Sequence, residues 1–570
     1  MKIRFFYVCI YKVGGEKMEK ELLYGRRELV PAIQVPKDLT SVLVLPTMEI
    51  KGGLIRCCRC NHQFTKDQVA LPNQQYYCPA CINLGRVSTL SKFYHVAEPN
   101  QFDPAKPILK WQGELSPLQV EAAETVKTKM ATHAHHLLWA VTGAGKTEMT
   151  YPAIAQALEN KERVAIASPR IDVCRELYPR FKRDFDVEIA LLYGGMEEPY
   201  AYRQLTICTT HQLLRFYHAF DLLIVDEVDA FPYAMNPELL FATKQAIKPD
   251  GGLLLMTATP DQRLLQRVRK KELSISYLPL RYHRHLLPEI HPVMVGNWRK
   301  RVTKGYLPTS LIAWINRRLN EQREFLFFVP HIADLAGVAS VLRRRFKNAR
   351  FATVHAADPD RATKVMQMRQ HGLDFLITTT ILERGVTFPA IDLLVLGADD
   401  PVFSPAALVQ IAGRVGRSPK RPTGNVTFFI GAYAKNVTQA MQQIKLVNQK
   451  GRRLQWKTVC YVINGWTGNQ VSKPSFYQGT SKYHCFVKPA GRVFKLGRDL
   501  IVPVVVELVP TVNCAWTAKV GKNEAPQWSK LPRAINIIRR CMTLCNVISS
   551  TVTTVCARFF GLNLPSGQNG

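Results

Sequence analysis

The sequence is poor in acidic residues and lacks long apolar runs. Against 76 Lys and Arg, the chain contains only 44 Asp and Glu, which gives a formal charge of +32. No apolar stretch approaches the roughly 18 residues that a membrane-spanning helix needs. The apolar run at residues 5–11 is shorter still, and no small-residue cleavage site follows it. We therefore expect neither a membrane span nor a secretory signal, and the basic excess favours a polyanionic partner, either a nucleic acid or an anionic membrane surface.

A glycine-bearing loop lies between an apolar strand, expected at residues 137–139, and the start of a helix. The loop reads Ala-Val-Thr-Gly-Ala-Gly-Lys-Thr at residues 140–147. Successive backbone N–H groups in such a loop, together with the helix N-terminus, surround a polyphosphate. Lys146 is expected to reach the terminal phosphates and Thr147 to ligate Mg²⁺. The loop residues expected to bind a nucleoside triphosphate are Gly143, Ala144, Gly145, Lys146 and Thr147.

A second motif supplies carboxylates at the end of a buried strand. Residues 221–225 form an unbroken apolar run after an initial Asp, and residues 226–229 read Asp-Glu-Val-Asp. Phosphoryl transfer needs positioned charge, so we assign Asp226 to Mg²⁺ and Glu227 to the attacking water. A solvated acidic turn is the alternative, but its place downstream of a phosphate loop favours the catalytic interpretation.

Strands and helices alternate over residues 101–275 and again over residues 300–453. The second stretch is expected to contain strands at residues 325–329, 375–379, 393–396 and 426–430. Such alternation predicts an α/β fold with mostly parallel sheets covered on both faces. We expect two nucleotide-fold lobes with a cleft between them, connected by residues 276–300.

Two arginines, Arg414 and Arg417, lie three positions apart in the second stretch. They follow Gln410 and are interspersed with Gly413 and Gly416. Guanidinium groups suit the charge that spreads over a transferring γ-phosphate. We expect both arginines at the start of a helix that faces the cleft, with a basic surface turn as the alternative.

Two pairs of cysteines precede the phosphate loop. Cys57 and Cys60 form one C-x-x-C pair, and Cys78 and Cys81 form the other. Two such knuckles close a tetrahedral Zn²⁺ site without an open position, so the expected zinc ion is structural. A disulfide or free thiols are the alternatives. The spacing favours Cys57 and Cys60 over the neighbouring Cys58.

Taken in order, these motifs resemble the superfamily 2 helicase-type ATPases of the DEAD/DEAH-related group. The matching positions are Gln119 and residues 140–147, 167–170, 209–214, 226–229, 257–259, 327–330, 379–387 and 410–417. The resemblance implies two tandem RecA-like lobes, with Gln119 reading adenine and residues 257–259 coupling hydrolysis to lobe movement. It also implies that residues 167–170 and 209–214 contact a single nucleic-acid strand. The Asp-Glu-Val-Asp motif argues against the RNA-remodelling branch.

A Cys₄ zinc module upstream of such a motor is similar to the ComFA competence ATPases of Gram-positive bacteria. This resemblance covers roughly residues 20–453 and implies ATP-driven import of single-stranded DNA at the inner face of the cell membrane. It implies the companion protein ComFC, the recombination mediator DprA and the membrane DNA channel as partners. Two alternatives remain: a PriA-like replication-restart helicase, whose cysteines follow its phosphate loop, and a non-enzymatic, zinc-tethered DNA-binding scaffold.

The remaining segments are less informative. We expect an N-terminal segment at residues 1–50, in which residues 1–17 are an upstream extension before Met18, and a zinc module at residues 52–90. The tail at residues 454–570 has fourteen Lys and Arg against three Asp and Glu, and no strand–helix alternation. It is either a basic nucleic-acid-binding tail or the product of a frame change. The histidines at positions 133, 135 and 136 are interpreted as a polar loop, and Trp298 as a side chain that could stack on a base.

Overall fold

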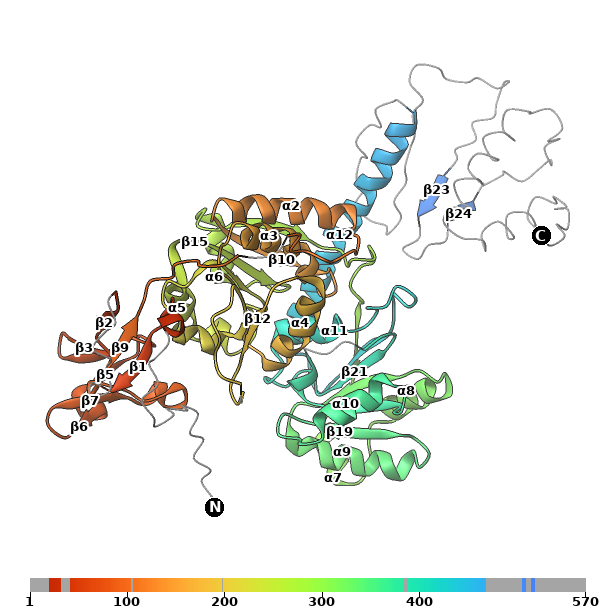
Figure 1. Cartoon of the computed structure of the whole chain (residues 1–570). Coiled ribbons are helices and arrows are strands. Elements are labelled where there is room, and N and C mark those ends of the chain that lie inside the picture. Colours follow the sequence, from red (N-terminus) through yellow and green to blue (C-terminus); the bar gives the residue numbers. More distant parts are fainter. Residues whose placement is uncertain are drawn as a thin grey trace, which may run out of the picture. The chain divides into compact units, whose positions relative to one another are not determined.

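The computed structural model describes residues 20–31, 41–103, 106–196, 198–383 and 388–467, and two short strands further on. The chain divides into a unit of Met1–Thr458 and a unit of Val459–Gly570. In the second unit the described strands are β23 (Val505–Leu508) and β24 (Cys514–Thr517), which pair antiparallel (Figure 1). The expected extension at residues 1–17 and nearly all of the expected tail lie outside the described residues.

The first lobe is built on a seven-stranded sheet in which every strand pair is parallel. In spatial order its strands are β12 (Ile189–Leu192), β13 (Leu205–Thr209), β11 (Val164–Ser168), β14 (Phe220–Val225), β15 (Ile247–Thr257), β10 (His135–Ala140) and β16 (Ser274–Leu278). The helices are α2 (Pro117–Ala131), α3 (Lys146–Glu159), α4 (Ile171–Asp184), α5 (Pro237–Ala246) and α6 (Gln262–Arg269). Every residue of β14 is buried, as its unbroken apolar run predicts for a central parallel strand.

The second lobe contains a six-stranded parallel sheet. Its strands, in spatial order, are β17 (Ile290–Met294), β22 (Val426–Ile430), β21 (Asp392–Leu396), β18 (Phe325–Phe328), β20 (Phe375–Thr378) and β19 (Phe351–Val354). Its helices are α7 (Trp298–Thr303), α8 (Thr309–Asn320), α9 (Ile332–Arg345), α10 (Arg361–Arg369), α11 (Pro405–Ala412) and α12 (Lys435–Thr467). The predicted fold class, α/β with two tandem RecA-like parallel-sheet lobes, is confirmed, and all four predicted strands are present within one residue at either end.

The connection between the lobes is shorter than the predicted 276–300. Strand β16 ends at Leu278 and β17 begins at Ile290, so only residues 279–289 cross from one sheet to the other. The first residues of the predicted connection are the edge strand of the first lobe, and later ones form β17 and the start of α7. Both strands are five residues long, and the proline in β17 lies on an edge strand, where its missing N–H breaks no ladder.

Two local predictions are wrong. His135 and His136 lie within β10, and His136 is fully buried because the hydroxyls of Ser274 and Ser276 satisfy both of its ring nitrogens. Trp298 is only 4% exposed and packs in the core of the second lobe, so its ring is not available to stack on a base.

Three small antiparallel sheets precede the first lobe. One pairs β1 (Glu28–Pro31) and β2 (Leu43–Leu45) with β9 (Ser91–His95). The cysteine-bearing sheets contain β3 (Met48–Lys51), β4 (Leu54–Cys57) and β5 (Gln63–Thr65), and β6 (Ala70–Leu71), β7 (Gln75–Cys78) and β8 (Val87–Ser88). The predicted segments 1–50 and 52–90 are therefore interleaved, since strands from before residue 50 pair with strands on both sides of residue 90.

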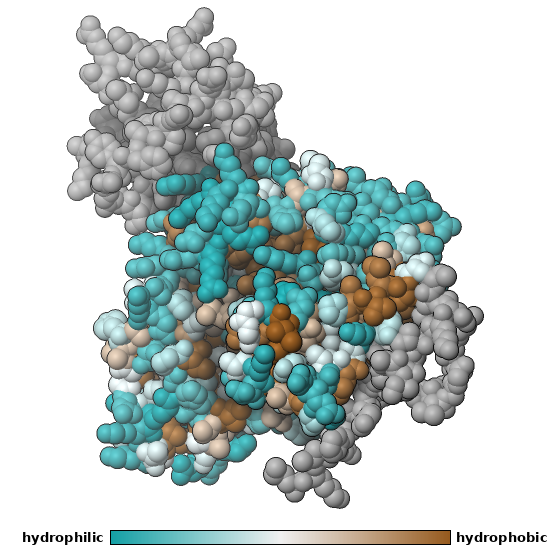
Figure 2. Space-filling model, turned by 90° about the vertical axis from the view of Figure 1, so that its left-hand side faces the viewer, coloured by the Kyte–Doolittle hydropathy of each residue, from teal (hydrophilic) through white to brown (hydrophobic). Residues whose placement is uncertain are grey.

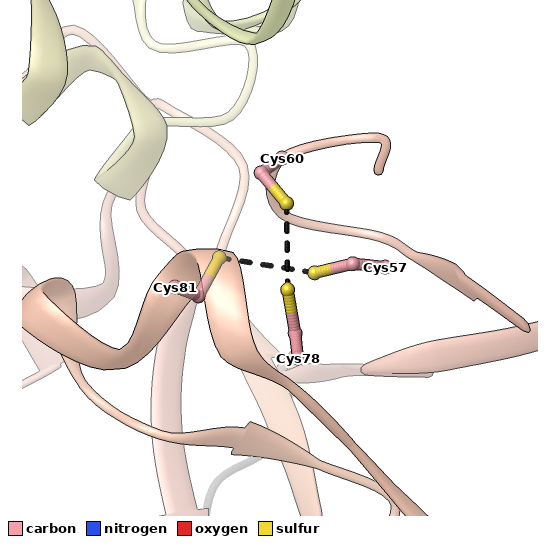
Figure 3. A group of neighbouring side chains, drawn as sticks. All are labelled: Cys57, Cys60, Cys78 and Cys81. Atoms are coloured by element: carbon pink, nitrogen blue, oxygen red, sulfur yellow. Dashed lines mark hydrogen bonds between the residues drawn. The ribbon is translucent and has the colours of Figure 1, made fainter. Parts of the chain in front are cut away.

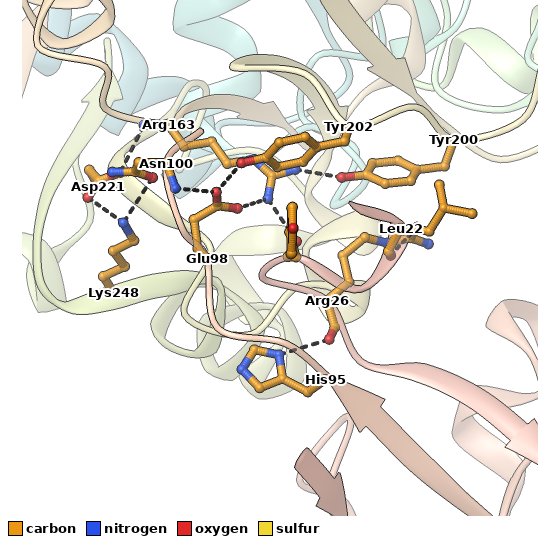
Figure 4. A network of polar contacts seen from close by, with 11 residues as sticks. Leu22, Arg26, His95, Glu98, Asn100, Arg163, Tyr200, Tyr202, Asp221 and Lys248 are labelled. Atoms are coloured by element: carbon orange, nitrogen blue, oxygen red, sulfur yellow. Dashed lines mark hydrogen bonds and ion pairs between the residues drawn. The ribbon is translucent and has the colours of Figure 1, made fainter. Parts of the chain in front are cut away.

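A buried polar network joins this N-terminal region to the first lobe (Figure 4). Arg163, which precedes β11, donates to Glu98 Oε2 over 2.5 Å and to the Tyr24 carbonyl over 3.0 Å. The side chains of Arg163 and Glu98 are both fully buried. Tyr202 donates to the other oxygen of Glu98, and Tyr200 accepts from Arg163. Because these charges compensate each other away from water, the two regions are held in one arrangement.

The same network continues to the start of β14. Asn100 donates its amide to Asp221 Oδ2 over 3.0 Å, and Lys248 forms an ion pair with Asp221 Oδ1 at 2.7 Å. Asp221 also accepts from the backbone N–H of Arg163 over 2.8 Å.

On the face of the molecule shown in Figure 2, hydrophilic residues predominate and hydrophobic ones form small separate areas.

Candidate functional site

The phosphate-type loop is formed between β10 and α3. Gly143 and Gly145 have φ values of +79° and +74°, in the left-handed region that favours glycine. Lys146 is the first residue of α3, and its Nζ donates to the Ala140 carbonyl over 3.2 Å. The loop therefore curls around the lysine and presents the N-terminus of α3 to the space above it.

A cavity of about 380 Å³ lies over this loop and is lined from both lobes. This volume is within the range of small-molecule sites. Of the residues predicted for the nucleotide site, those that line it are Gly143, Gly145, Lys146, Thr147, Asp226, Glu227, Arg414 and Arg417. Ala144 and Gln119 are not among the described residues that line it.

Asp226 and Glu227 directly follow β14 and project into the cavity. The backbone N–H of Asp226 donates to the Ala167 carbonyl over 2.9 Å, and Asp226 Oδ1 accepts from the N–H of Glu227 over 2.8 Å. Glu227 has a φ of +53°, an unfavourable conformation that is found at functional sites when the surroundings hold it in place. The turn therefore directs two adjacent carboxylates toward the same cavity.

Burial dominates the electrostatics of this pair. It raises the pKa of Asp226 to about 6, with a further contribution from Glu227, while Lys146 acts in the opposite direction. Burial also lowers the pKa of Lys146, and the carboxylates of Asp226, Asp229 and Glu227 oppose that shift. A cation that entered here would favour the charged form of the carboxylates.

The predicted arginines reach the cavity from the other lobe. Arg414 is 2% exposed, its Nε donates to the Glu383 carbonyl over 3.0 Å, and its Nη1 has no hydrogen-bond partner among the described residues. Burial, and then the neighbouring Arg417, lower the pKa of Arg414. Arg414 and Arg417 follow the end of α11 rather than starting a helix, because Gly413 already forms its C-cap. The prediction of a helix start is therefore wrong, although both side chains line the cavity.

The two lobes approach closely beside the cavity. Thr142 Oγ1 donates to Gln410 Oε1 over 3.3 Å, and a Cβ atom added at Gly413 would lie 2.6 Å from the same Thr142 Oγ1. Only a glycine at position 413 leaves room for this contact. Across the interface, Arg170 forms an ion pair with Glu383 at 2.6 Å.

Gln119 lies beside the loop but does not face the cavity. Its Oε1 accepts from the backbone N–H of Ser116 over 2.9 Å and completes a capping box at the start of α2. Its Nε2 donates to the Ala144 carbonyl over 2.9 Å. The predicted reader of adenine thus holds the helix start against the phosphate-type loop.

The four predicted cysteines gather at the ends of β4 and β7 (Figure 3). Their sulfur atoms all lie within 4.8 Å of one another, and the Cys57–Cys81 and Cys60–Cys78 pairs are 3.8 and 3.6 Å apart. Four sulfurs bound tetrahedrally to zinc at 2.3 Å are about 3.8 Å apart, so the donor set fits this ion. None of the described cysteines forms a disulfide.

Position distinguishes Cys58 from the four clustered cysteines, because its sulfur is not part of the cluster. Within the cluster, hydrogen bonds between the sulfurs lower the pKa of Cys57 and raise the pKa values of Cys60 and Cys81. Burial raises the pKa of Cys58 to about 12, so this residue stays a thiol.

Comparison with known proteins supports the same arrangement. Residues 116–268 match the DEAD/DEAH box helicase family, and residues 308–419 match the helicase conserved C-terminal domain. The competence protein ComFA of Streptococcus pneumoniae is 39% identical over 406 residues, which cover 71% of this chain and 93% of that protein. ComFA of Bacillus subtilis is 39% identical over 413 residues, which cover 72% of this chain and 89% of that protein.

The chain belongs to the ComFA family. With both helicase domains in place, this ComFA-family chain is a helicase-type ATPase. Among solved structures, S. cerevisiae Dbp5 bound to RNA and ADP BeF3 is similar over 58% of this chain and 91% of that chain, at 15% identity and a TM-score of 0.43. None of the described helices is both long and apolar enough to cross a membrane.

Sequence reasoning missed two residues of the ComFA-family site. Asp229 Oδ1 accepts from Thr257 Oγ1 over 2.7 Å, and Asp229 Oδ2 accepts from Thr259 Oγ1, so the motif at residues 226–229 is bonded to the motif at residues 257–259. Arg281, in the connection between the lobes, donates from Nη1 to the Gly416 carbonyl over 2.6 Å. No local pattern identifies Arg281, because its partner is far along the chain.

The motif at residues 379–387 is only partly described, since its last four residues lie outside the described part of the chain. The segment that directly follows the motif at residues 209–214 is bonded to the N-terminal region. The N–H of Arg27 donates to the Arg215 carbonyl over 3.0 Å, and the N–H of Tyr217 donates to the Gly25 carbonyl over 2.9 Å. In this ComFA-family chain the residues that precede the cysteine-bearing sheets are therefore attached beside a segment expected to contact nucleic acid.

Proposed function

We propose that this chain hydrolyses ATP and uses the energy to move along single-stranded DNA during DNA uptake. The observation that carries the proposal is the buried Arg414, whose Nη1 has no hydrogen-bond partner among the described residues and which lines the same cavity as Lys146 and Asp226. Buried cations are costly unless they are compensated. Glu227, Glu176 and Glu383 offset part of this cost, and a triphosphate would add negative charge and an acceptor for Nη1.

Each residue has a chemical task in this proposal. Lys146 binds the terminal phosphates, and Arg414 and Arg417 stabilise the charge that spreads over the transferring phosphoryl group. Glu227 orients the attacking water. Thr147 and Asp226 would hold Mg²⁺, which neutralises phosphate charge when bound. Arg414 and Arg417 come from the second lobe, so bound nucleotide would favour lobe closure.

The nucleic-acid part of the proposal rests on the family and on charge. The relatives are named competence proteins, and the chain carries a formal charge of +32. We propose single-stranded DNA as the track, gripped by its backbone without sequence preference through residues 167–170 and 209–214. ComFC, DprA and the membrane DNA channel are the proposed partners, at the inner face of the cell membrane.

We also propose that Cys57, Cys60, Cys78 and Cys81 bind one structural Zn²⁺ ion. The separations between their sulfur atoms support it, and four thiolates leave no open coordination position for catalysis.

The first experiment compares steady-state ATP hydrolysis without nucleic acid and with single-stranded DNA, duplex DNA or RNA. We expect strong stimulation by single-stranded DNA and complete loss of turnover in Lys146→Ala, because the cation that binds the terminal phosphates is removed. The control is Lys445→Ala, an exposed lysine on α12. Full turnover in Lys146→Ala contradicts the site assignment. Efficient separation of forked duplexes would instead favour the PriA-like alternative.

A further inference from the structure

The connection between the lobes touches both halves of the nucleotide site. The N–H of Tyr282 donates to the Gly143 carbonyl of the phosphate-type loop over 3.0 Å. On either side of it, Arg281 Nη1 and His283 Nε2 both donate to the Gly416 carbonyl, over 2.6 and 3.0 Å. The backbone of Tyr282 is therefore fixed against both lobes.

The side chain of Tyr282 is presented to the cavity rather than packed away. It lines the cavity and is 41% exposed, and its hydroxyl donates to the Arg417 carbonyl over 3.5 Å. Arg180 of α4 lines the same cavity, and Glu148 holds its guanidinium in an ion pair. The cavity wall thus offers an aromatic ring and a planar guanidinium, and both groups stack on nucleobases.

The side chain that was predicted to read the edge of a base is not available at this cavity. Gln119 is 5% exposed, and both ends of its carboxamide are bonded to protein backbone. A site that reads a base by hydrogen bonds rejects the wrong base strongly, because buried polar groups are left unpaired. A site that only stacks tolerates every base, since each has a π-face.

We propose that Tyr282, supported by Arg180, is the stacking platform for the nucleoside base, and that this site binds adenine and guanine nucleotides with little discrimination. This proposal rests on the proposed nucleotide-binding function. Gln119 then acts as a positioning residue that fixes the start of α2 against the phosphate-type loop.

The test is calorimetric binding of ADP, GDP and inorganic pyrophosphate, each with Mg²⁺, to the full chain. We expect ADP and GDP to bind within about threefold of each other, as a stacking site predicts. Tyr282→Ala should weaken both nucleotides about tenfold, since the platform is lost, and leave pyrophosphate unchanged because it has no base. Tyr282→Phe keeps the ring and should bind like the wild type. The matched control is Tyr433→Ala, an 83% exposed tyrosine that does not line the cavity.

Three results would overturn the proposal. ADP binding a hundredfold tighter than GDP, with the preference lost in Gln119→Ala, would make Gln119 the reader of the base. Equal weakening of ADP and pyrophosphate in Tyr282→Ala would give Tyr282 a purely structural task. If none of the three probes binds the wild-type chain, the proposed function itself fails, and the platform fails with it.

Discussion

Asp229 connects two motifs that are distant in the sequence. Its carboxylate accepts hydrogen bonds from the hydroxyls of Thr257 and Thr259, where β15 ends. Because Asp229 is on the same turn as Asp226 and Glu227, a shift at the end of β15 would displace the proposed metal and water residues. The carboxylate therefore links the position of the β15 end to that of the two site carboxylates.

We expect Asp229→Ala to lower kcat for ATP by about tenfold to a hundredfold and to leave KM within about twofold, because it misplaces the carboxylates without removing a phosphate contact. Steady-state kinetics measures both constants. The control is Asp250→Asn, which changes an exposed carboxylate on β15. A large rise in KM with unchanged kcat would contradict the link.

His136 makes the first lobe sensitive to acid. Burial lowers its pKa to about 4, while in the unfolded chain the ordinary value applies. The unfolded state therefore binds the proton first as pH falls, so folding stability is lost between about pH 6.5 and pH 4.

This residue should contribute about 2 kcal/mol to the loss of unfolding free energy between pH 7.5 and pH 5. Urea denaturation at the two pH values measures it, and His136→Gln should show a correspondingly smaller pH dependence. An equal pH dependence in both proteins would mean that His136 is not the titrating group.

The residues that sequence reasoning identified are those whose chemistry is local. Each of these motifs can be recognised from a few consecutive positions. They are the phosphate-type loop, the carboxylates after β14 and the two cysteine pairs. Arg281 and Tyr282 carry no such pattern, since their partners at Gly143 and Gly416 come from other elements. The hydrogen-bond partners of Gln119 could not be predicted from the sequence either, because a capping box and a contact with a base would use the same side-chain carboxamide.

At the scale of elements, the fold of the cysteine-bearing module, residues 48–88, depends on two short C-x-x-C knuckles and has little apolar core. Small modules of this kind use metal binding as part of their folding free energy. Arg27 donates to the Cys58 carbonyl over 2.7 Å, and the His62 ring contacts the carboxylate of Glu238 in α5, so the module is also tied to the N-terminal region and to the first lobe.

We expect one zinc ion per purified chain by metal analysis, and its loss in Cys78→Ser, because three thiolates cannot close the site. Limited proteolysis should then cut within residues 48–88, while ADP binding stays within about threefold of the wild type. Cys58→Ser should retain the ion, since Cys58 lies outside the sulfur cluster. A zinc content unaffected by Cys78→Ser would refute the ligand set.

Elements were predictable where burial leaves a long apolar run. The central strands β14, β18 and β21 are buried and have such apolar runs. In contrast, β16 is a half-exposed edge strand and β17 contains a proline, so neither has a long apolar run. The interleaving of β1, β2 and β9 was not predictable, because antiparallel pairing across sixty residues leaves no periodic signal in either partner.

For the whole molecule, the unit that carries the nucleotide site ends at Thr458, part-way along α12. This helix belongs to the second lobe but returns to the first. Lys450 lies over the rings of Trp139 and Tyr277, at 5.2 and 4.7 Å, and Gln455 donates to the Arg284 carbonyl over 2.6 Å.

A chain ending at residue 458 should therefore keep its DNA-stimulated ATPase within about twofold of the full-length protein, because it retains every contact of α12 with the first lobe described above. A chain ending at residue 445 loses the contacts of Lys450 and Gln455 and should unfold at lower urea. ATPase assays and denaturation test the pair. Loss of DNA stimulation in the longer chain would assign a function to the tail.

The strand order of the first lobe also has a consequence for biosynthesis. The strand that leads into the phosphate-type loop, β10, comes first in the lobe, but its two neighbours, β15 and β16, come last. On the ribosome this strand has no sheet neighbour until β15 has been translated, and its other edge stays unpaired until translation has passed Leu278. Codon changes that slow translation between β10 and β16 should prolong the exposure of an apolar strand, and the nascent chain would need chaperones most in that interval.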